Sequence, residues 1–226
     1  MSDVAVLIPA LDCSATVYSV VVGARRHVAD VVVVNDGSSD DTAAEARRGG
    51  AQVIEHDRRR GKGVALLTGM RALHDRGMRR VLTMDADGQH LPDEIPVMLR
   101  ASDQYPGAVI IGMRRMETVP IAPMRLFGNR FANRWVEIAC GLRLPDTQSG
   151  FRVYPLAQTL GLGVRSEHFG FETEVLVRAA RAGLAIKSVP VRVFYPPAAE
   201  RISHFRPFVD TVRIILIVLG LIFRVW

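Results

Sequence analysis

Residues 31–48 read VVVVNDGSSDDTAAEARR, and this stretch decides the fold class. Its apolar start predicts a strand, its polar middle a loop, and residues 41–48 a short helix. The strand is apolar at successive positions rather than alternating, which is typical of a parallel sheet that is covered on both faces. We therefore expect an α/β fold.

The same order recurs on both sides of this stretch. Strands that alternate with amphipathic helices form a mostly parallel sheet flanked by helices, a Rossmann-like arrangement. Further strands are predicted at VAVLIP (4–9), AQVIE (51–55), RRVLTMD (79–85), GAVIIG (107–112) and LAIKSVPVRVFY (184–195), and further helices at 15–27, 63–76, 123–140 and 169–183.

Composition is that of a folded domain. The chain has 226 residues, 49% of them hydrophobic, which is enough to build a core, and no repeat or linker divides it. We expect one domain over residues 1–200, followed by a separate segment over 201–226. Cys13 and Cys140 are too few for a disulfide scaffold, and the start of the chain lacks the basic region of a cleaved signal. A cytoplasmic protein is expected.

The charge is basic, with a formal net charge of +6 and a pI near 10.0. Nearly all basic side chains are arginine, since Lys62 and Lys187 are the only lysines. Arginine binds phosphate through a planar fork, so a nucleotide, a lipid phosphate or an anionic bilayer is a plausible partner, although a compositional bias explains the excess equally well. No recognition motif accompanies the charge, so nucleic acid is not an expected partner.

The last segment contains ten apolar residues in a row, Ile214 to Phe223, between Arg213 and Arg224. A helix needs about 20 apolar residues to cross a bilayer, so this run is too short to span one. We expect an amphipathic helix that lies in a membrane interface, with its arginines near phosphate headgroups. The alternative is a helix that is buried against the domain or against a second copy.

Polar segments follow the first four strands. They read PALDCS, NDGSSDD, HDRRRGKG and DADGQH. Ligands of parallel sheets bind beyond the carboxyl ends of the strands, where such loops meet. Four aspartates fall in these loops, namely Asp12, Asp36, Asp85 and Asp87. This edge is therefore the predicted site.

Asp85 and Asp87 form the most specific pair within VLTMDADGQH, residues 81–90. In an extended segment, side chains at i and i+2 face the same side, so the two carboxylates can converge. They repel each other unless a positive charge joins them, and Mg²⁺ or Mn²⁺ prefers oxygen ligands of this kind. The pair predicts a divalent cation that is bound together with a diphosphate.

The segments VLIPALD, VVVVNDGSSDDT, RGKGVALLTGM and VLTMDADGQHLPDEIPVML, followed by IGMRR, DTQSGFRVY and GFETEVLVRAARAG, resemble family 2 glycosyltransferases of the GT-A fold. Within that family the chain is most similar to the dolichyl- or polyprenyl-phosphate sugar synthases. The motifs occur in the family's order and extend to about residue 195, so the resemblance is highly specific.

The resemblance implies a set of nucleotide-binding residues, which are Pro9, Ala10, Leu11, Val34, Asp36, Lys62, Asp85 and Ala86. It places the metal on Asp85, Asp87 and Gln89. The chain departs from the family at Asp12 and Cys13, where an Asn-Glu pair is common. Without the resemblance, Asp36 and Lys62 have other possible roles. Asp36 could instead form an Asx-turn or helix cap, and Lys62 could be an exposed turn lysine.

The resemblance implies that Asp87 and Arg114 are catalytic and that Arg114 contacts phosphate. Arg125, Arg130, Gln148 and Ser149 are the implied residues for the acceptor or sugar. Glu172 and Glu174 occupy positions where the family often places acids near the donor sugar. Acidic residues are also favoured at a helix N-terminus, which is a second explanation for both.

These observations predict an enzyme that moves a sugar from a UDP- or GDP-linked donor to a polyprenyl phosphate. The transfer is expected to invert the configuration at the anomeric carbon. An anionic phosphate oxygen needs no strong general base, and the sequence singles out none. The expected location is the inner face of the cell membrane, with peripheral contact through the C-terminal segment. A hydroxyl acceptor is the nearest alternative. A nucleotidyltransferase-like binding protein and a membrane scaffold with a vestigial pocket are more distant ones.

Overall fold

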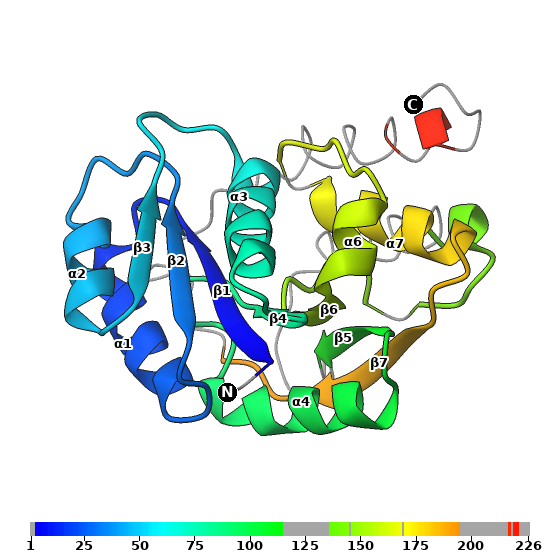
Figure 1. Ribbon diagram of the computed structural model, residues 1–226, viewed down its shortest axis with the longest axis horizontal. Helices are drawn as coiled ribbons and strands as arrows, with labels where there is room; N and C mark the ends of the chain where they lie inside the picture. Colours follow the sequence, from blue (N-terminus) through cyan, green and yellow to red (C-terminus); the bar gives the residue numbers. More distant parts are fainter. Residues whose placement is uncertain are drawn as a thin grey trace.

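The computed structural model describes residues 3–114, 136–144, 146–168, 170–194, 217 and 219–221. The described strands form a seven-stranded sheet in the order β3-β2-β1-β4-β6-β5-β7 (Figure 1). The strands are β1 (Val4–Ala10), β2 (Val31–Asn35), β3 (Gln52–Glu55), β4 (Arg80–Thr83), β5 (Val109–Arg114), β6 (Arg152–Pro155) and β7 (Ile186–Val191). The helices are α1 (Ser14–Arg25), α2 (Thr42–Arg48), α3 (Lys62–Asp75), α4 (Ile95–Gln104), α6 (Leu156–Gly161) and α7 (Phe171–Arg181), with a short 3₁₀ turn η1 (Pro92–Glu94).

The first half of the sheet matches the expectation from sequence. β1 pairs in parallel with β2 and with β4, and β2 pairs in parallel with β3. All five residues of β2 are buried, as its unbroken apolar run predicts. The predicted α/β fold with a mostly parallel sheet is confirmed.

The second half contains a strand that the sequence did not reveal. β6 lies between β4 and β5 and runs antiparallel to both, whereas β5 and β7 are parallel. Because β6 is reversed, the residues just before it lie at the same edge as the carboxyl end of β4. β6 has only four residues, and its pairing with β4 joins positions far apart in the chain, so no local pattern marks it. The helices α4 and α6 were not predicted either.

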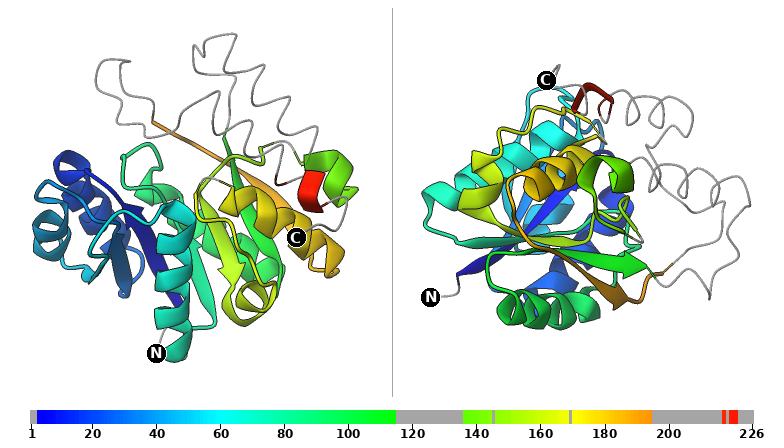
Figure 2. Two further views of the ribbon diagram at one scale, coloured as in Figure 1. Left: turned by 90° about the horizontal axis from the view of Figure 1, so that it is seen from above. Right: turned by 90° about the vertical axis from the view of Figure 1, so that its right-hand side faces the viewer.

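Two hydrophobic layers hold the sheet between helices. One layer packs α1 and α4 on one face, and the other packs α3, α6 and α7 on the opposite face. The right-hand view of Figure 2 shows α4 on one side of the sheet and α3 and α7 on the other. Gly69 lets α3 approach β1 closely, since a Cβ there would lie 2.2 Å from Leu7 Cδ1.

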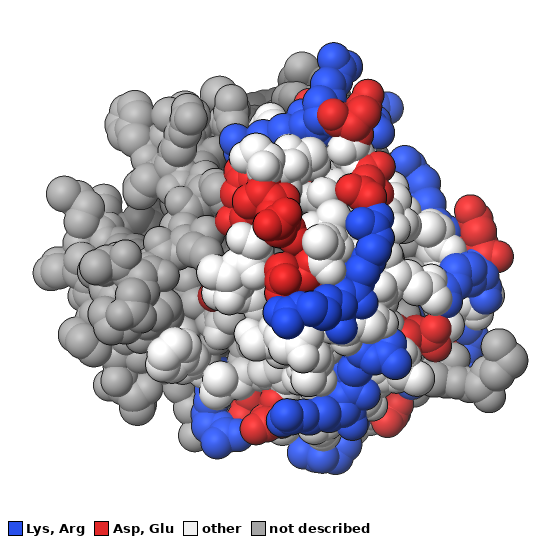
Figure 3. Space-filling view, turned by 90° about the vertical axis from the view of Figure 1, so that its left-hand side faces the viewer, with Lys and Arg blue, Asp and Glu red and all other residues white. Residues whose placement is uncertain are grey.

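The face beside β3 carries both signs of charge. Figure 3 shows Lys and Arg side chains interspersed with Asp and Glu over this side of the molecule. Arg47 pairs there with Glu55, and Arg48 pairs with Glu45. Such exposed pairs contribute little to stability. This face is therefore not a uniform basic patch, despite the net charge of +6.

The described part of the C-terminal segment packs against the domain. Ile217 and Leu221 join the hydrophobic layer that contains α7, and Arg181 Nη1 donates to the Leu221 carbonyl at 2.6 Å. For these residues the structure supports the alternative of a helix that is buried against the domain. Within the described residues, no helix combines the length and the apolar character that a membrane span requires. Of the predicted helix over 123–140, only 136–140 is described, and it is helical.

Candidate active site

The loops at the carboxyl edge of the parallel strands contact one another, as predicted. Asp12 in the loop after β1 accepts a hydrogen bond from the Ser39 N–H after β2, at 2.8 Å. Asp36 after β2 accepts one from the Gly61 N–H before α3, at 2.7 Å. Lys62 at the start of α3 pairs with Asp85 after β4, at 2.6 Å. The four segments therefore form one continuous edge.

Asp85 is neutralised from within the protein. The Lys62 ammonium lies 2.6 Å from Asp85 Oδ1 and 2.8 Å from Glu172 Oε1. Burial raises the pKa of the Asp85 carboxyl, but the charge and hydrogen bond of Lys62, together with further positive charge nearby, outweigh this effect and lower the pKa to about 2. Burial likewise opposes the charge on Lys62, and the two carboxylates outweigh it and raise its pKa. The alternative of an exposed turn lysine is wrong, since the Lys62 side chain is only 17% exposed.

Asp87 has a different environment. Its Oδ1 accepts a hydrogen bond from the Gln89 N–H at 3.0 Å, and among the described residues no cation forms an ion pair with it. Burial and the charge of Asp85 raise the pKa of Asp87 to about 6. One member of the predicted pair thus has a resident counter-charge and the other does not.

A divalent cation fits this arrangement. Asp87 is half-buried, and its raised pKa reflects negative charge that the protein leaves uncompensated. Among the residues that the structure describes, no group of three His, Cys, Asp or Glu could enclose a metal. Mg²⁺ is commonly held by one or two carboxylates together with substrate phosphates, and a site with Asp85, Asp87 and Gln89 leaves positions for such oxygens.

His90 packs at the end of β4. It is buried, its Nδ1 accepts a hydrogen bond from the Asp85 N–H at 3.0 Å, and its ring stacks on Phe151 at 5.2 Å. Burial lowers the pKa of His90 to about 4, so the ring is neutral near pH 7. His90 therefore fixes the backbone at the end of β4.

Asp36 holds the loop before α3 through hydrogen bonds to its backbone. Its carboxylate is buried and accepts hydrogen bonds from His56 Nδ1 at 2.7 Å, from the Arg60 N–H at 2.9 Å and from the Gly61 N–H. His56 Nε2 in turn contacts Thr68 Oγ1 at 3.1 Å. Asp36 forms neither an Asx-turn nor a helix cap. Its contact with a nucleotide base stays a prediction.

Two other acids of this edge also serve the backbone. Asp12, which has a positive φ of 48°, bonds the Ser39 N–H and hydroxyl. Asp40 accepts hydrogen bonds from the Ser14 and Thr42 N–H groups and from the Thr42 hydroxyl. These bonds hold the loops after β1 and β2 together at the N-terminal ends of α1 and α2.

The remaining predicted nucleotide residues line the ends of β1, β2 and β4. Pro9 and Leu11 are half-buried, whereas Ala10, Val34 and Ala86 are closed off from solvent. The Ala86 carbonyl accepts a hydrogen bond from Thr16 Oγ1 at 2.6 Å.

Arg114 leads from β5 into the same region. Its Nε and Nη2 donate to the two carboxylate oxygens of buried Asp146, each at 2.8 Å. This two-pronged pair fixes the plane of the guanidinium group. The contact of Arg114 with phosphate stays a prediction. Arg125 and Arg130 lie outside the described residues.

Gln148 and Ser149 lie in the loop that leads into β6. Ser149 is buried, and its Oγ accepts a hydrogen bond from the Phe151 N–H at 3.3 Å. Gln148 is half-buried. Thr83 Oγ1 donates to the Gly150 carbonyl at 2.8 Å and so ties this loop to β4. A Cβ on Gly150 would lie 2.9 Å from Asp85 Oδ2 and 3.0 Å from Lys62 Nζ, so a larger residue here would require this ion pair to shift.

Arg152, which the resemblance places in the DTQSGFR segment that closes over the sugar, supports this loop from inside. It is fully buried and donates to the carbonyls of Thr147 and Ser149 at 2.7 Å and of Glu172 at 2.8 Å. It also donates to the Tyr154 hydroxyl at 3.3 Å. One guanidinium group thus joins the 147–149 loop to the start of α7. Its place in SGFR was visible in the sequence, but its burial was not.

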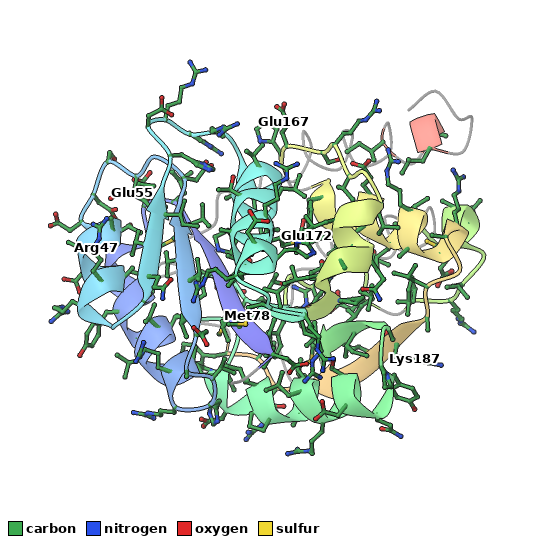
Figure 4. The ribbon with its side chains drawn as sticks, viewed as in Figure 1. Arg47, Glu55, Met78, Glu167, Glu172 and Lys187 are labelled. Carbon is green, nitrogen blue, oxygen red and sulfur yellow. The ribbon has the colours of Figure 1, made fainter. Side chains whose placement is uncertain are left out.

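Glu172 and Glu174, at the start of α7, have separate roles. Figure 4 shows Glu172 beside α3, where its Oε1 meets Lys62. Glu174 bonds the Arg165 and Ser166 N–H groups and Arg178 Nε, so it holds a loop. That loop in turn covers the start of α3, because the Gly63 N–H donates to the Glu167 carbonyl at 2.9 Å. Only Glu172 therefore joins the cluster.

A sheet of this order with a pair of aspartates beyond its fourth strand is the GT-A fold of glycosyltransferases. Glucosyl-3-phosphoglycerate synthase of Mycobacterium tuberculosis in complex with phosphoglyceric acid matches with a TM-score of 0.75 over 96% of this chain and 79% of that chain, at 22% identity. The same synthase with Mn²⁺, uridine diphosphate and glucosyl-3-phosphoglycerate matches with a TM-score of 0.71 at 22% identity, over 96% and 79% of the two chains.

The chain belongs to glycosyl transferase family 2, whose sequence profile matches residues 5–157. It is 32% identical over 174 residues to the undecaprenyl-phosphate mannosyltransferase of Micrococcus luteus. The aligned region covers 72% of this chain and 70% of the relative. It is 32% identical over 178 residues to the polyprenol monophosphomannose synthase of Mycolicibacterium smegmatis, with 71% and 65% covered. The predicted family is confirmed.

Proposed function

We propose that this protein transfers a sugar from a UDP- or GDP-linked donor to a polyprenyl phosphate, with inversion at the anomeric carbon. Three relatives support the acceptor, since their names specify undecaprenyl phosphate, a polyprenol monophosphomannose product and dolichyl phosphate. The observation that carries the proposal is the unequal pair Asp85 and Asp87, of which only Asp85 has a cation of the protein beside it.

The donor diphosphate is expected next to this pair. Asp87, with Asp85 and Gln89, would hold a divalent cation, which when bound offsets the negative charge that grows on the departing nucleoside diphosphate. Lys62 brings a second positive charge to the same place. The backbone that bears Pro9, Ala10 and Leu11, together with the loop that Asp36 holds, would surround the nucleoside.

The acceptor is expected on the side of Arg114 and the loop before β6. Arg114 is held flat by Asp146, with its guanidinium group half-buried beside the edge. Gln148 and Ser149 would border the sugar. Asp85, Glu172 and Glu174 are each engaged by lysine, arginine or backbone N–H groups, and Asp87 is the predicted metal ligand, so we assign none of these acids as a strong base. A phosphate oxygen is already anionic and requires none.

Membrane contact belongs to the proposal as well. The acceptor of such a reaction lies in a bilayer, and the segment 201–226 carries the apolar run with its flanking arginines. We infer peripheral contact at the inner face of the cell membrane through this segment. Ile217 and Leu221 face the domain, so the contact would use other residues of the segment.

The test is a transfer assay with purified protein, polyprenyl phosphate and a panel of UDP- and GDP-sugars, with and without Mn²⁺. The expected product is a lipid-linked sugar that is labile to acid and stable to base. Thermal melting with the same panel identifies the donor, because a ligand that binds only the folded state raises the melting temperature. Transfer to a hydroxyl acceptor alone, with none to polyprenyl phosphate, would replace this proposal by the hydroxyl-acceptor alternative.

A further inference from the structure

Lys62 lies between two carboxylates that differ in their exposure to solvent. Its ammonium is within 2.6 Å of Asp85 Oδ1 and 2.8 Å of Glu172 Oε1. The Asp85 side chain is 29% exposed, whereas that of Glu172 is 7% exposed. Asp85 thus faces the space where a ligand can enter, and Glu172 faces the interior. Figure 4 places Glu172 between α3 and the elements that follow β6.

A divalent cation on Asp85 conflicts with the position of Lys62. The lysine already occupies one oxygen of that carboxylate, and two cations that share a carboxylate lie within a few ångströms of each other. At such distances like charges repel by several kcal/mol even at an effective dielectric constant of about 20. A metal that binds Asp85 therefore requires Lys62 to withdraw from it.

Glu172 offers the place to which Lys62 can withdraw. Its Oε1 is already in contact, and its Oε2 is buried with no hydrogen-bond partner. A buried carboxylate oxygen without a donor is costly, so a second hydrogen bond from Lys62 would stabilise it. Glu172 itself is held in place, because Arg152 Nη1 donates to its carbonyl at 2.8 Å. The acceptor of the displaced ammonium is thus fixed in position.

We propose that Lys62 is a resident counter-ion that the divalent metal must displace from Asp85, and that Glu172 receives the displaced ammonium. The consequence is an order of binding. The metal binds weakly to the protein alone and tightly together with the donor diphosphate, which adds oxygen ligands. This inference rests on the proposed function, since it takes a nucleoside diphosphate as the molecule that accompanies the metal.

Two substitutions shift the balance in opposite directions. Lys62→Met removes the competing cation, so we expect the Kd for Mn²⁺ without nucleotide to fall about tenfold. Glu172→Gln keeps the size of the side chain but removes the alternative partner of Lys62, which leaves the ammonium on Asp85. We expect that variant to raise the Kd for Mn²⁺ about threefold. A role that is only structural would weaken binding in both variants.

The measurement is Mn²⁺ binding by electron paramagnetic resonance, for the full chain, with and without UDP or GDP. Matched controls are Lys187→Met and Glu55→Gln, which remove the same charges from exposed positions on β7 and β3. Figure 4 shows Lys187 and Glu55 away from Glu172. Circular dichroism melts establish that each variant is folded. We also expect the nucleotide to strengthen Mn²⁺ binding more in the wild type than in Lys62→Met.

Opposite shifts in the two folded variants, with controls that match the wild type, would support the proposal. Shifts in the same direction, shifts no larger than those of the controls, or no Mn²⁺ binding by any form would overturn it. If Lys62→Met does not fold, the result for Glu172→Gln decides alone. The binding measurement contains neither sugar nor acceptor, so it can fail while sugar transfer succeeds, and the two proposals are tested separately.

Discussion

The loops after β2 and β4 carry acids at the same edge of one sheet but use them differently. Asp36 and Asp40, after β2, are surrounded by N–H and hydroxyl donors of the protein. Asp87, after β4, receives a single backbone N–H, from Gln89, among the described residues. Carboxylates of the first kind hold loops together, and a carboxylate of the second kind retains oxygens for a ligand. The supply of internal donors therefore separates the acids that hold the loop after β2 from Asp87, the predicted metal ligand.

The largest test of this contrast is Asp87→Asn. We expect transfer activity to fall at least about a thousandfold, because the substitution removes the principal predicted metal ligand. Stability at pH 7 should rise by on the order of 2 kcal/mol, since the substitution removes a charge that burial and Asp85 disfavour. The measurements are the transfer assay and thermal melting, with exposed Asp93→Asn as the control. Activity within tenfold of the wild type would contradict the assignment.

Asp36→Asn should show the reverse pattern. The amide turns one acceptor into a donor that faces the Arg60 and Gly61 N–H groups or His56, so the free energy of unfolding should fall by about 2–4 kcal/mol. Urea denaturation measures this change. Asp41→Asn, at an exposed position in the same loop without a side-chain cap bond, is the matched control and should shift stability by less than about 0.5 kcal/mol. Equal stability of both variants would remove the distinction between the two loops.

The pH dependence of stability gives a finer test of Asp87. Burial and the charge of Asp85 raise its pKa from 3.8 to about 6, so the folded state holds the proton more tightly than the unfolded state. Its contribution is therefore fully present below about pH 4 and is lost as the pH rises through about 6. Relative to Asp87→Asn, the metal-free wild type should lose on the order of 2 kcal/mol across this window.

Urea denaturation in EDTA at a series of pH values measures that difference. Mn²⁺ with a nucleoside diphosphate should reduce the effect, because a bound cation keeps Asp87 ionised. A difference between wild type and variant that is flat from pH 4 to pH 7 would show that Asp87 carries no excess charge in the folded state.

The smallest expected effect is that of Gly150→Ala. The added methyl group would lie 2.9 Å from Asp85 Oδ2 and 3.0 Å from Lys62 Nζ, so the ion pair must shift. We expect kcat/KM to fall about tenfold and the free energy of unfolding to fall by about 1–2 kcal/mol. Gly161→Ala is the control, since nothing lies within 4 Å of its added Cβ. Unchanged kinetics would mean that the Asp85–Lys62 pair tolerates displacement.

The first half of the sheet could be predicted because its signals are local. Each strand from β1 to β4 is a short apolar run that is followed by polar residues, and α1 and α3 show helical periodicity. β6 escaped prediction because only its pairing with β4 and β5 makes it a strand. α4 was not predicted, although its first five residues belong to the segment VLTMDADGQHLPDEIPVML, which carries the family resemblance.

The candidate site divides in the same way. Asp85, Asp87 and Lys62 were predicted from motifs, but the pairing of Lys62 with Asp85 and Glu172 was not, because it brings together three distant parts of the chain. The sequence suggested that a metal alone supplies the counter-charge of the aspartates. For Asp85 that interpretation was incomplete. His56 was missed, and Arg152 was placed over the sugar rather than inside the loop, for the same reason, since side chains acquire such roles only through burial.

The reversed direction of β6 has a consequence for how the protein is made. The first four strands contain everything needed to pair with one another, but Gly150, Arg152 and Glu172 reach the edge only after β6 has inserted between β4 and β5. Such long-range pairing forms slowly, because the loop must close before the contacts stabilise it. During synthesis the amino-terminal half can thus be ordered before these later residues have packed around Lys62 and Asp85. We therefore expect the candidate active site to be completed last, after the carboxy-terminal half has been synthesised.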